Sequence, residues 1–124
     1  MILETLPEIF VICKLAPDAG IPEWALTSSI FSITKTNEEL SIVCVQTKPP
    51  TDLKAERDWR CFRVKGTLDF GLTGVLASLA NPLAQAAISI FAISTFDTDY
   101  LMVKQSSFEK AVTVLSKAGH EVVS

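Results

Sequence analysis

Residues 88–105 read Ile-Ser-Ile-Phe-Ala-Ile-Ser-Thr-Phe-Asp-Thr-Asp-Tyr-Leu-Met-Val-Lys-Gln. The stretch starts with a nearly continuous apolar segment, Ile88 to Phe96, passes through the polar turn Asp97-Thr98-Asp99, and continues as Tyr100 to Gln105. Apolar runs on both sides of a short polar turn are typical of two antiparallel strands. The stretch therefore predicts a hairpin whose first strand is largely buried.

The segments around this hairpin predict two helices and two further strands. Apolar residues recur with helical spacing after Gly71 and again from Phe108 to Ala118, where Gly119 ends the pattern. Pro82 predicts a kink or a restart in the first helix, because proline lacks the amide hydrogen. With strands at 61–68 and 120–123, the order is strand, helix, strand, strand, helix, strand. This is the split βαβ order of ferredoxin-like folds, an α+β class with both helices on one face of a four-stranded antiparallel sheet.

The first half of the chain contains a shorter version of the same pattern. Strands are predicted at 8–15, 31–36 and 40–46, a single helical turn at 22–25, and a helix at 51–59 behind a Thr or Asp cap. Its hairpin also repeats, since Phe31, Ile33 and Val43 recur 60 residues later as Phe91, Ile93 and Val103. We therefore predict two related units, a degenerate one over 1–60 (strand, short turn, hairpin, helix) and a complete one over 61–124.

Composition limits the partners and the compartment. The 124 residues are 48% hydrophobic and carry a net charge of −3, with no cluster of Lys and Arg that would bind a nucleic acid. No apolar run approaches the about 20 residues that cross a bilayer, and the N-terminus lacks the basic flank of a secretory signal. The three cysteines, Cys13, Cys44 and Cys61, lie in apolar runs and predict buried thiols. We expect a cytosolic protein without a nucleic-acid or membrane partner.

Residues for conventional catalysis are missing from the sequence. His120 is the single histidine, no Cys or His pair has metal-binding spacing, and no GxSxG motif is present. A metal site at Asp97 and Asp99 would need further oxygen ligands, and the sequence identifies none. We therefore expect no enzyme activity, no catalytic residue, no cofactor and no metal.

Two polar segments are candidate binding sites. Gly71-Leu72-Thr73-Gly74 precedes a helix whose first amides favour an anion such as a carboxylate. The turn from Ser94 to Asp99 offers Asp97 and Asp99 to an ammonium, a guanidinium or a cation. Both segments also have a purely structural interpretation, because glycines permit tight turns and Asp and Thr satisfy their own backbone in turns. A GxxG loop also marks KH domains, but this copy has no Lys or Arg and joins a strand to a helix.

The residues of these segments resemble a known family. Gly71-Leu72-Thr73-Gly74-Val75-Leu76, Asn81-Pro82-Leu83-Ala84, and Ser94-Thr95-Phe96-Asp97-Thr98-Asp99-Tyr100 resemble the ACT-domain proteins related to the CASTOR arginine sensors of animals and to small bacterial homologues. Residues 31–45 look like the first ACT unit of that family. The resemblance implies tandem βαββαβ units that hold small regulatory ligands, usually amino acids, at the interface between units.

The resemblance also implies which residues touch the ligand. They belong to the loop before the first helix of one unit, to the polar turn, and to a strand of the neighbouring unit: Phe70, Gly71, Leu72, Thr73, Thr95, Phe96, Asp99, Ser41 and Ile42. The chemistry of the turn adds Asp97 to the candidate ligand contacts. Helix-terminus amides would then bind the α-carboxylate of an amino acid, and Asp97 or Asp99 would face its ammonium or basic side chain. Binding would act on an assembly or on a regulatory protein partner. The alternative is a ligand-free interaction domain in which sheet edges pair two copies into a homodimer.

Overall fold

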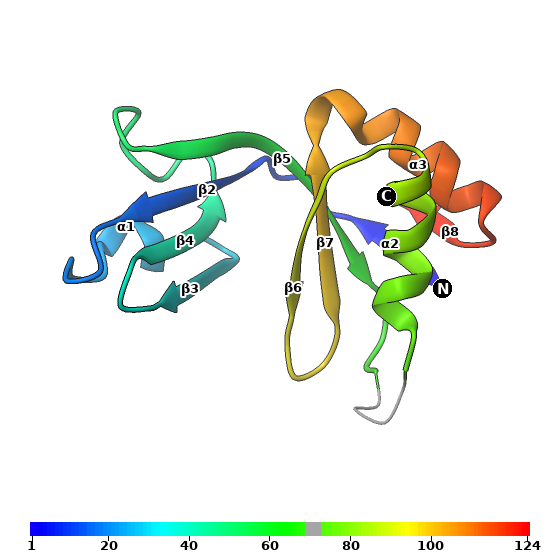
Figure 1. Ribbon diagram of the computed structural model, residues 1–124, viewed down its shortest axis with the longest axis horizontal. Helices are drawn as coiled ribbons and strands as arrows, with labels where there is room; N and C mark the ends of the chain where they lie inside the picture. Colours follow the sequence, from blue (N-terminus) through cyan, green and yellow to red (C-terminus); the bar gives the residue numbers. More distant parts are fainter. Residues whose placement is uncertain (69–72) are drawn as a thin grey trace. The chain divides into compact units, whose positions relative to one another are not determined.

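The computed structural model describes residues 1–68 and 73–124 (Figure 1). Its helices and strands follow in the order β1 (Ile2–Thr5), β2 (Phe10–Leu15), α1 (Glu23–Leu26), β3 (Phe31–Lys35), β4 (Leu40–Val45), β5 (Ala55–Val64), α2 (Val75–Gln85), β6 (Ile90–Ser94), β7 (Asp99–Lys104), the 3-10 turn η1 (Gln105–Ser107), α3 (Phe108–Lys117) and β8 (Glu121–Val123). They form two compact units. The smaller unit is Glu8–Trp59, and the larger unit is Met1–Pro7 together with Arg60–Ser124.

The larger unit has the predicted βαββαβ order, with one additional strand. From β5 onward the chain forms β5, α2, β6, β7, α3 and β8, and the strands lie in the order β6, β7, β5, β1, β8. β1 is antiparallel to β5 and parallel to β8, so it lies between the first and last strands of the motif. The α+β class and the ferredoxin-like unit are confirmed, whereas the sheet is mixed because of the inserted β1.

One apolar core joins both helices to one face of this sheet. It contains buried residues from α2, α3 and the strands β1, β5 and β7: Leu3, Phe62, Val64, Leu79, Leu83, Leu101, Val103, Ala111 and Leu115. Phe108, at the start of α3, stacks on Phe62 with 5.5 Å between ring centroids, and the Arg60 guanidinium lies 4.1 Å from the Phe108 ring centre. Each fully buried Leu or Phe stabilises the fold by about 1.5–3 kcal/mol. The helices are therefore held to the sheet by packing rather than by helix propensity alone.

The smaller unit has a four-stranded order, β3, β4, β2, β5, and one helical turn. As predicted, Pro22 precedes that turn, and Ala25 on it is fully buried. Ala25 packs with residues that alternate along β2 and β4: Val11, Cys13, Leu40, Ile42 and Cys44. A single turn of helix covers this face of the sheet. The sequence predicts such a turn in place of a full first helix.

The predicted helix over 51–59 is wrong, because these residues enter strand β5. Trp59 lies opposite Phe10 and Ala55 opposite Cys13 in antiparallel pairing with β2. The register shifts between Phe10 and Ile12, and Asp58 adopts a left-handed φ of 67° at this bulge. The Gln46 side chain stabilises the bulge with two hydrogen bonds to Asp58, of 2.6 Å from the backbone amide and 2.9 Å to the carboxylate. Pairing with β2 overrides the local helix propensity.

The division of the chain also differs from a simple cut at residue 60. Residues 1–7, expected in the first unit, belong to the larger unit instead. Leu3 is buried in the larger core, and Glu4 lies opposite Arg63 with 3.0 Å between carboxylate and guanidinium. The reason is that β1 fills the position between β5 and β8. The smaller unit is therefore an insertion within the larger one.

The two hairpins are related by 59 residues rather than 60. Hydrogen-bonded pairing places Lys35 opposite Leu40 and Ser94 opposite Asp99, so the centres of the turns differ by 59 positions. At this offset Ile42 corresponds to Leu101 and Cys44 to Val103, and all four face the core of their own unit. The apparent 60-residue repeat of Phe and Ile is wrong by one residue, which in a strand exchanges the two faces.

Helix α2 runs through Pro82 without a restart. Pro82 lacks the amide hydrogen that would bond to the carbonyl of Ser78, four residues earlier. His120 supplies the missing donor, since its Nε2 lies 3.0 Å from the Ser78 oxygen. A carbonyl oxygen only accepts, so Nε2 carries the hydrogen in this contact. His120 is thus a structural residue that compensates for the proline.

This contact predicts an interaction between positions 82 and 120. We expect His120→Ala to lower the free energy of unfolding by about 0.5–1.5 kcal/mol, the usual contribution of one hydrogen bond. In the background of Pro82→Ala the restored amide at position 82 can donate to the Ser78 carbonyl. The loss of unfolding free energy caused by His120→Ala should then fall toward zero. Urea denaturation of the four proteins in this double-mutant cycle measures the effect. Equal costs in both backgrounds would contradict the interpretation.

Candidate functional site

The polar turn of the larger unit is fixed by its own threonines. The Thr95 amide donates to the Thr98 carbonyl at 2.9 Å, and the Thr95 hydroxyl donates to the same carbonyl at 3.0 Å. The Thr98 amide lies 3.3 Å from the Thr95 hydroxyl oxygen. At the base of the turn, the Ser94 hydroxyl donates to the Asp99 carboxylate at 2.6 Å. The turn therefore has one defined conformation, and the Asp99 carboxylate is oriented by Ser94.

Two hydrogen bonds join this turn to the segment that follows β5. The Thr98 side chain is only 5% exposed, and its hydroxyl donates to the Val64 carbonyl at 2.7 Å. The Leu68 amide donates to the Asp97 carbonyl at 2.6 Å. The chain therefore leaves β5 in direct contact with the polar turn and then leads to α2. Phe70, Gly71 and Leu72 lie outside the described residues.

The start of α2 provides the second part of the candidate site. Thr73 is exposed, and Gly74 precedes the helix with a left-handed φ of 77°, a conformation that favours glycine. Within the described residues, the first turn of α2 contains no acidic side chain, and Gly74 at the cap position has no side chain that could accept a hydrogen bond. The first amides of the helix are therefore not neutralised by these residues. Such amides carry a partial positive charge and suit a carboxylate.

The acidic and aromatic residues of the turn differ in exposure. Asp97 is exposed, Asp99 is half-buried, and Phe96 is 80% exposed at the tip of the turn. A carboxylate that is partly buried and held by a hydroxyl is well suited to bind an ammonium group, because a charge-assisted hydrogen bond is stronger away from bulk water. The turn and the start of α2 together provide groups of opposite character for a small dipolar molecule.

Ser41 and Ile42, the predicted contacts from the other unit, lie on β4 of the smaller unit. Ile42 is fully buried in the core of that unit, and packing accounts for its side chain. Ser41 is half-buried on the opposite face. Ligand contact by these two residues stays a prediction.

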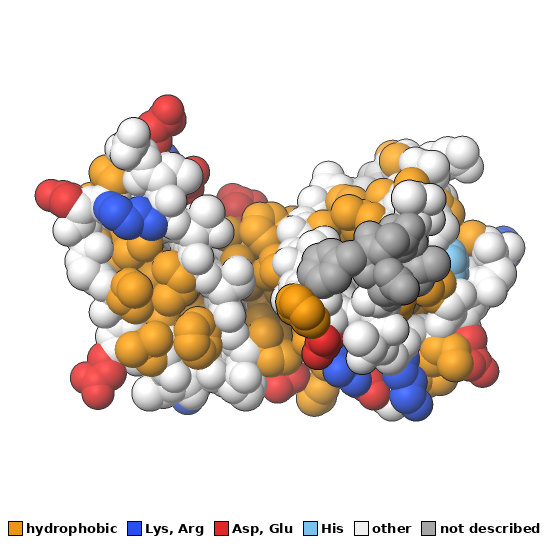
Figure 2. All heavy atoms as spheres, turned by 90° about the horizontal axis from the view of Figure 1, so that it is seen from below, with side chains coloured by type: hydrophobic (Ala, Val, Ile, Leu, Met, Phe, Trp, Pro, Cys, Tyr) orange, Lys and Arg blue, Asp and Glu red, His pale blue; other side chains and the backbone are white. Residues whose placement is uncertain are grey.

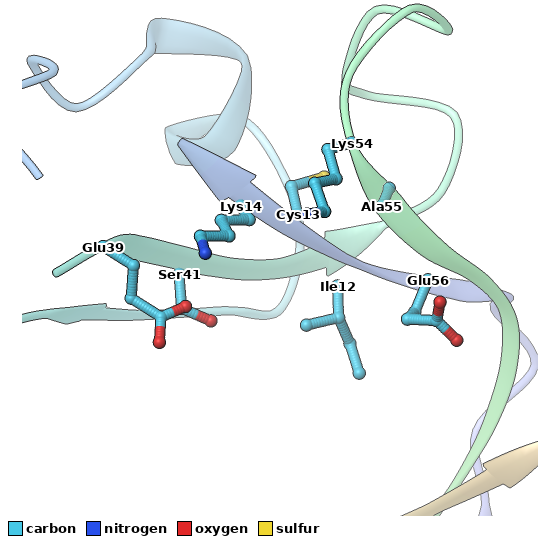
Figure 3. Close-up of a pocket in the computed structure, with 8 residues that line it drawn as sticks. All are labelled: Ile12, Cys13, Lys14, Glu39, Ser41, Lys54, Ala55 and Glu56. Carbon is cyan, nitrogen blue, oxygen red and sulfur yellow. The ribbon is translucent and has the colours of Figure 1, made fainter. Parts of the chain in front are cut away.

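Ser41 also lines a pocket of about 220 Å³ within the smaller unit (Figure 3). The other lining residues come from β2, from the turn before β4, and from the start of β5: Ile12, Cys13, Lys14, Glu39, Lys54, Ala55 and Glu56. Sequence reasoning did not identify this pocket. The alternation of side chains along β2 could have indicated it, because Ile12 and Lys14 point away from the face that buries Val11 and Cys13.

The buried cysteines are poor nucleophiles. Burial raises the pKa of the Cys44 thiol to about 11, with a further contribution from the nearby Cys13 and an opposing effect of Lys48. Burial also raises the pKa of Cys13, while Arg57 opposes the shift. Cys13, Cys44 and Cys61 are all free thiols. Since the thiolate is the reactive form, Cys13 and Cys44 are protonated and unreactive at neutral pH.

The described residues contain neither a metal-binding cluster nor a membrane-spanning helix. Within 1–68 and 73–124, no group of three or more His, Cys, Asp or Glu side chains is placed to hold a metal ion. Among the helices of this part of the chain, none has the length and apolar character needed to cross a membrane.

Two nested ferredoxin-like units with a polar turn beside a helix start define the class of small α+β domains to which regulatory ACT units belong. A family model described as ACT domain matches residues 54–117, which is more than half of the chain, and the chain belongs to that family. A second family model, described as an N-terminal domain, matches residues 8–52, within the smaller unit.

Known relatives agree with this assignment. The human protein named cytosolic arginine sensor for mTORC1 subunit 1 is 33% identical over 131 aligned residues, which cover 92% of this chain and 40% of the relative. The chain thus spans about two fifths of the length of that relative. A crystal structure of a protein from Agobacterium tumefaciens has 38% identity and a TM-score of 0.93, covering 98% of this chain and 91% of that one.

More distant structures share the fold. The regulatory subunit of aspartate kinase from Thermus thermophilus has a TM-score of 0.64 at 12% identity, covering 90% of this chain and 93% of that one. At this level of identity the likeness concerns the arrangement of helices and strands.

The buried hydroxyl of Thr98 yields a testable consequence for the turn. Thr98→Val keeps the shape of the side chain but leaves the Val64 carbonyl without this donor, and we expect a loss of about 1–3 kcal/mol in the free energy of unfolding. Chemical denaturation measures the loss. Ser94→Ala, at an exposed position of the same turn, is the control and should cost less. If Thr98→Val lowers the free energy of unfolding no more than the control does, the hydrogen bond to β5 contributes little to stability.

The raised thiol pKa values predict slow chemical labelling. With a pKa of about 11, only about one Cys44 thiol in a thousand is ionised at pH 8. A disulfide reagent should therefore label Cys13 and Cys44 slowly in the folded protein and quickly in urea. Folding lowers the labelling rate because it disfavours ionisation of the thiol. This reduction of the rate is complete below the ordinary thiol pKa and declines as the pH rises toward 11. Equal labelling rates in the folded and unfolded protein would contradict the burial argument.

Proposed function

We propose that this protein is an amino-acid-binding regulatory module whose ligand contacts the polar turn Thr95–Asp99 and the start of α2. The observation that carries the proposal is the pair of hydrogen bonds from Thr98 to Val64 and from Leu68 to Asp97. Through them the acidic turn and the chain that leads to α2 are held together in one unit. A zwitterion needs an anionic and a cationic partner, and in this proposal the turn supplies the first and the start of α2 the second.

The role of each group follows from its chemistry. The amides at the start of α2 would accept the α-carboxylate of the ligand, together with the predicted contacts Phe70, Gly71, Leu72 and Thr73. Asp99, oriented by Ser94 at 2.6 Å, or Asp97 would bind the ammonium or a basic side chain. Thr95 and the exposed Phe96 would border the ligand from the turn.

Relatives support the class of ligand. The human relative at 33% identity is named as a cytosolic sensor of arginine. We therefore propose a cytosolic, non-enzymatic protein in which binding of an amino acid shifts an assembly or the surface offered to a regulatory partner. A ligand shifts such an equilibrium only by its difference in affinity for the two states.

A thermal-shift screen of the twenty amino acids tests the proposal. A ligand present at a hundred times its Kd should raise the free energy of unfolding by about 2.7 kcal/mol. Asp99→Asn retains an acceptor for Ser94 but loses the negative charge, so it should reduce the shift while the unliganded stability stays nearly unchanged. No shift with any amino acid at millimolar concentration would sink the proposal.

Ser94→Ala provides the matched control. It removes the hydroxyl that orients Asp99 and keeps the carboxylate, so its thermal shift should lie between those of the wild type and of Asp99→Asn. A full response in Asp99→Asn would exclude this carboxylate from the site. Asp97→Asn, measured in the same way, then shows whether the neighbouring carboxylate binds the ligand instead.

A ligand-free interaction domain is the second candidate, and the exposed edge of the smaller unit favours it. Figure 2 shows apolar side chains gathered on one face of this unit, at the left of the view. Phe31 lies on the edge strand β3 and is 42% exposed, and Ile21 and Leu26 are more than half exposed. Edge strands with exposed apolar residues pair with other chains. Concentration-dependent association without any amino-acid response would favour this candidate.

A further inference from the structure

We infer that the pocket of the smaller unit is a second and separate binding site, which takes a small zwitterion, a molecule that carries both an ammonium and a carboxylate. The pocket is formed by residues of Glu8–Trp59 alone and is distinct from the turn Thr95–Asp99. The inference does not rest on the proposed function, because the pocket lies in the other unit and Ser41 is its only lining residue that is also a predicted contact of the first site.

The size of the pocket limits its occupant. At about 220 Å³ the pocket is smaller than the sites that bind drug-sized ligands, so it suits a small molecule. Drug-sized ligands and nucleotides need pockets of about 300–1,000 Å³. A free amino acid with a short side chain matches the available volume.

The strand pairing places the charged groups on one face. Lys14 lies directly opposite Ser41, and Ile12 lies opposite Glu56. Glu39, two residues before Ser41, continues the same face of β4, away from the buried Leu40 and Ile42. Figure 3 shows Ile12, Glu39, Ser41 and Glu56 pointing to the same side of the sheet. Three strands therefore contribute both signs of charge around an apolar side chain.

The balance of charge selects the ligand class. The lining contains two ammonium groups, from Lys14 and Lys54, and two carboxylates, from Glu39 and Glu56. A simple anion would meet repulsion from the carboxylates, and a simple cation from the lysines. A zwitterion can approach a group of opposite sign with each end. Glu39 is half-buried, and a partly buried carboxylate binds an ammonium more strongly than an exposed one.

The internal repeat gives an independent reason to expect a site here. At the 59-residue offset the turn Thr36–Glu39 corresponds to Thr95–Thr98, and in both turns the threonine amide donates to the fourth residue's carbonyl at 2.9 Å. Thr36 also accepts the amides of Glu38 and Glu39 at 3.1 Å each. The pocket borders this turn through Glu39. Each unit thus has polar binding groups beside the equivalent turn.

Amide NMR spectra of the whole chain test the inference. Glycine, L-alanine and L-serine are titrated against propionate and ethylamine, which each carry one of the two charges. We expect the three zwitterions to shift the amides of Lys14, Glu39 and Glu56, which line the pocket alone, and the two single-charge analogues to leave them nearly unchanged. Shifts confined to residues 73 and 94–99 would overturn the second site while supporting the proposed function. Comparable shifts with propionate or ethylamine would overturn the selectivity for a zwitterion.

Two variants of one turn provide the matched comparison. Glu39→Gln removes a carboxylate from the pocket and should raise the Kd about tenfold or more, as expected for loss of a charged partner. Glu38→Gln removes a carboxylate from the same turn outside the pocket and should leave the Kd unchanged. The dispersion of the amide spectrum reports that both variants are folded. Equal Kd values in the two variants would overturn the assignment, and an unchanged titration of the pocket in Asp99→Asn would show that the two sites are separate.

Discussion

The extended conformation of β5 is the constraint on which the rest of the structure depends. Its first half pairs with β2 in the smaller unit, and its second half pairs with β1 in the larger unit. Between them the bulge at Asp58 changes the register and is held by the side chain of Gln46. If residues 55–59 formed a helix, β2 would lose one of its two neighbours. The same strand ends at Val64, whose carbonyl receives the Thr98 hydroxyl, so the position of the polar turn depends on it as well.

The sequence predicted most elements correctly where the local pattern and the tertiary partner agree. The hairpin β6–β7, both helices of the larger unit and the single turn at Glu23 follow from apolar spacing and from Pro22. The prediction failed where tertiary pairing determines the structure. Residues 55–59 have helix-forming side chains but pair with β2, and β1 is too short to be recognised without β5 and β8 beside it. The apparent repeat was wrong by one position because similar apolar residues occur on both faces of a buried strand.

The candidate site was predictable in its chemistry and less so in its supports. Asp99 and the glycine-rich start of α2 are visible in the sequence as a polar turn and a helix signal. Ser94 as the partner of Asp99, and Thr98 as a buried link to β5, depend on a hairpin register that the sequence does not specify. The pocket at Lys14 and Glu39 was not predicted, because its charged residues look like ordinary surface residues in the sequence. Only the pairing of the strands brings them together. His120, which in the sequence is only the single histidine, compensates for Pro82 through its contact with the Ser78 carbonyl.

The nesting of one unit inside the other has a consequence for synthesis of the chain. Residues 8–59 contain every strand partner that their own sheet requires, and Phe10 and Trp59 stand opposite one another near the two junctions. This segment can therefore acquire its structure while later residues are still being made. β1, although translated earlier, has to wait for β5 and for β8 near residue 121. Because the ends of the inserted segment meet, the region is also a natural place for evolution to exchange one module for another without disturbing the host.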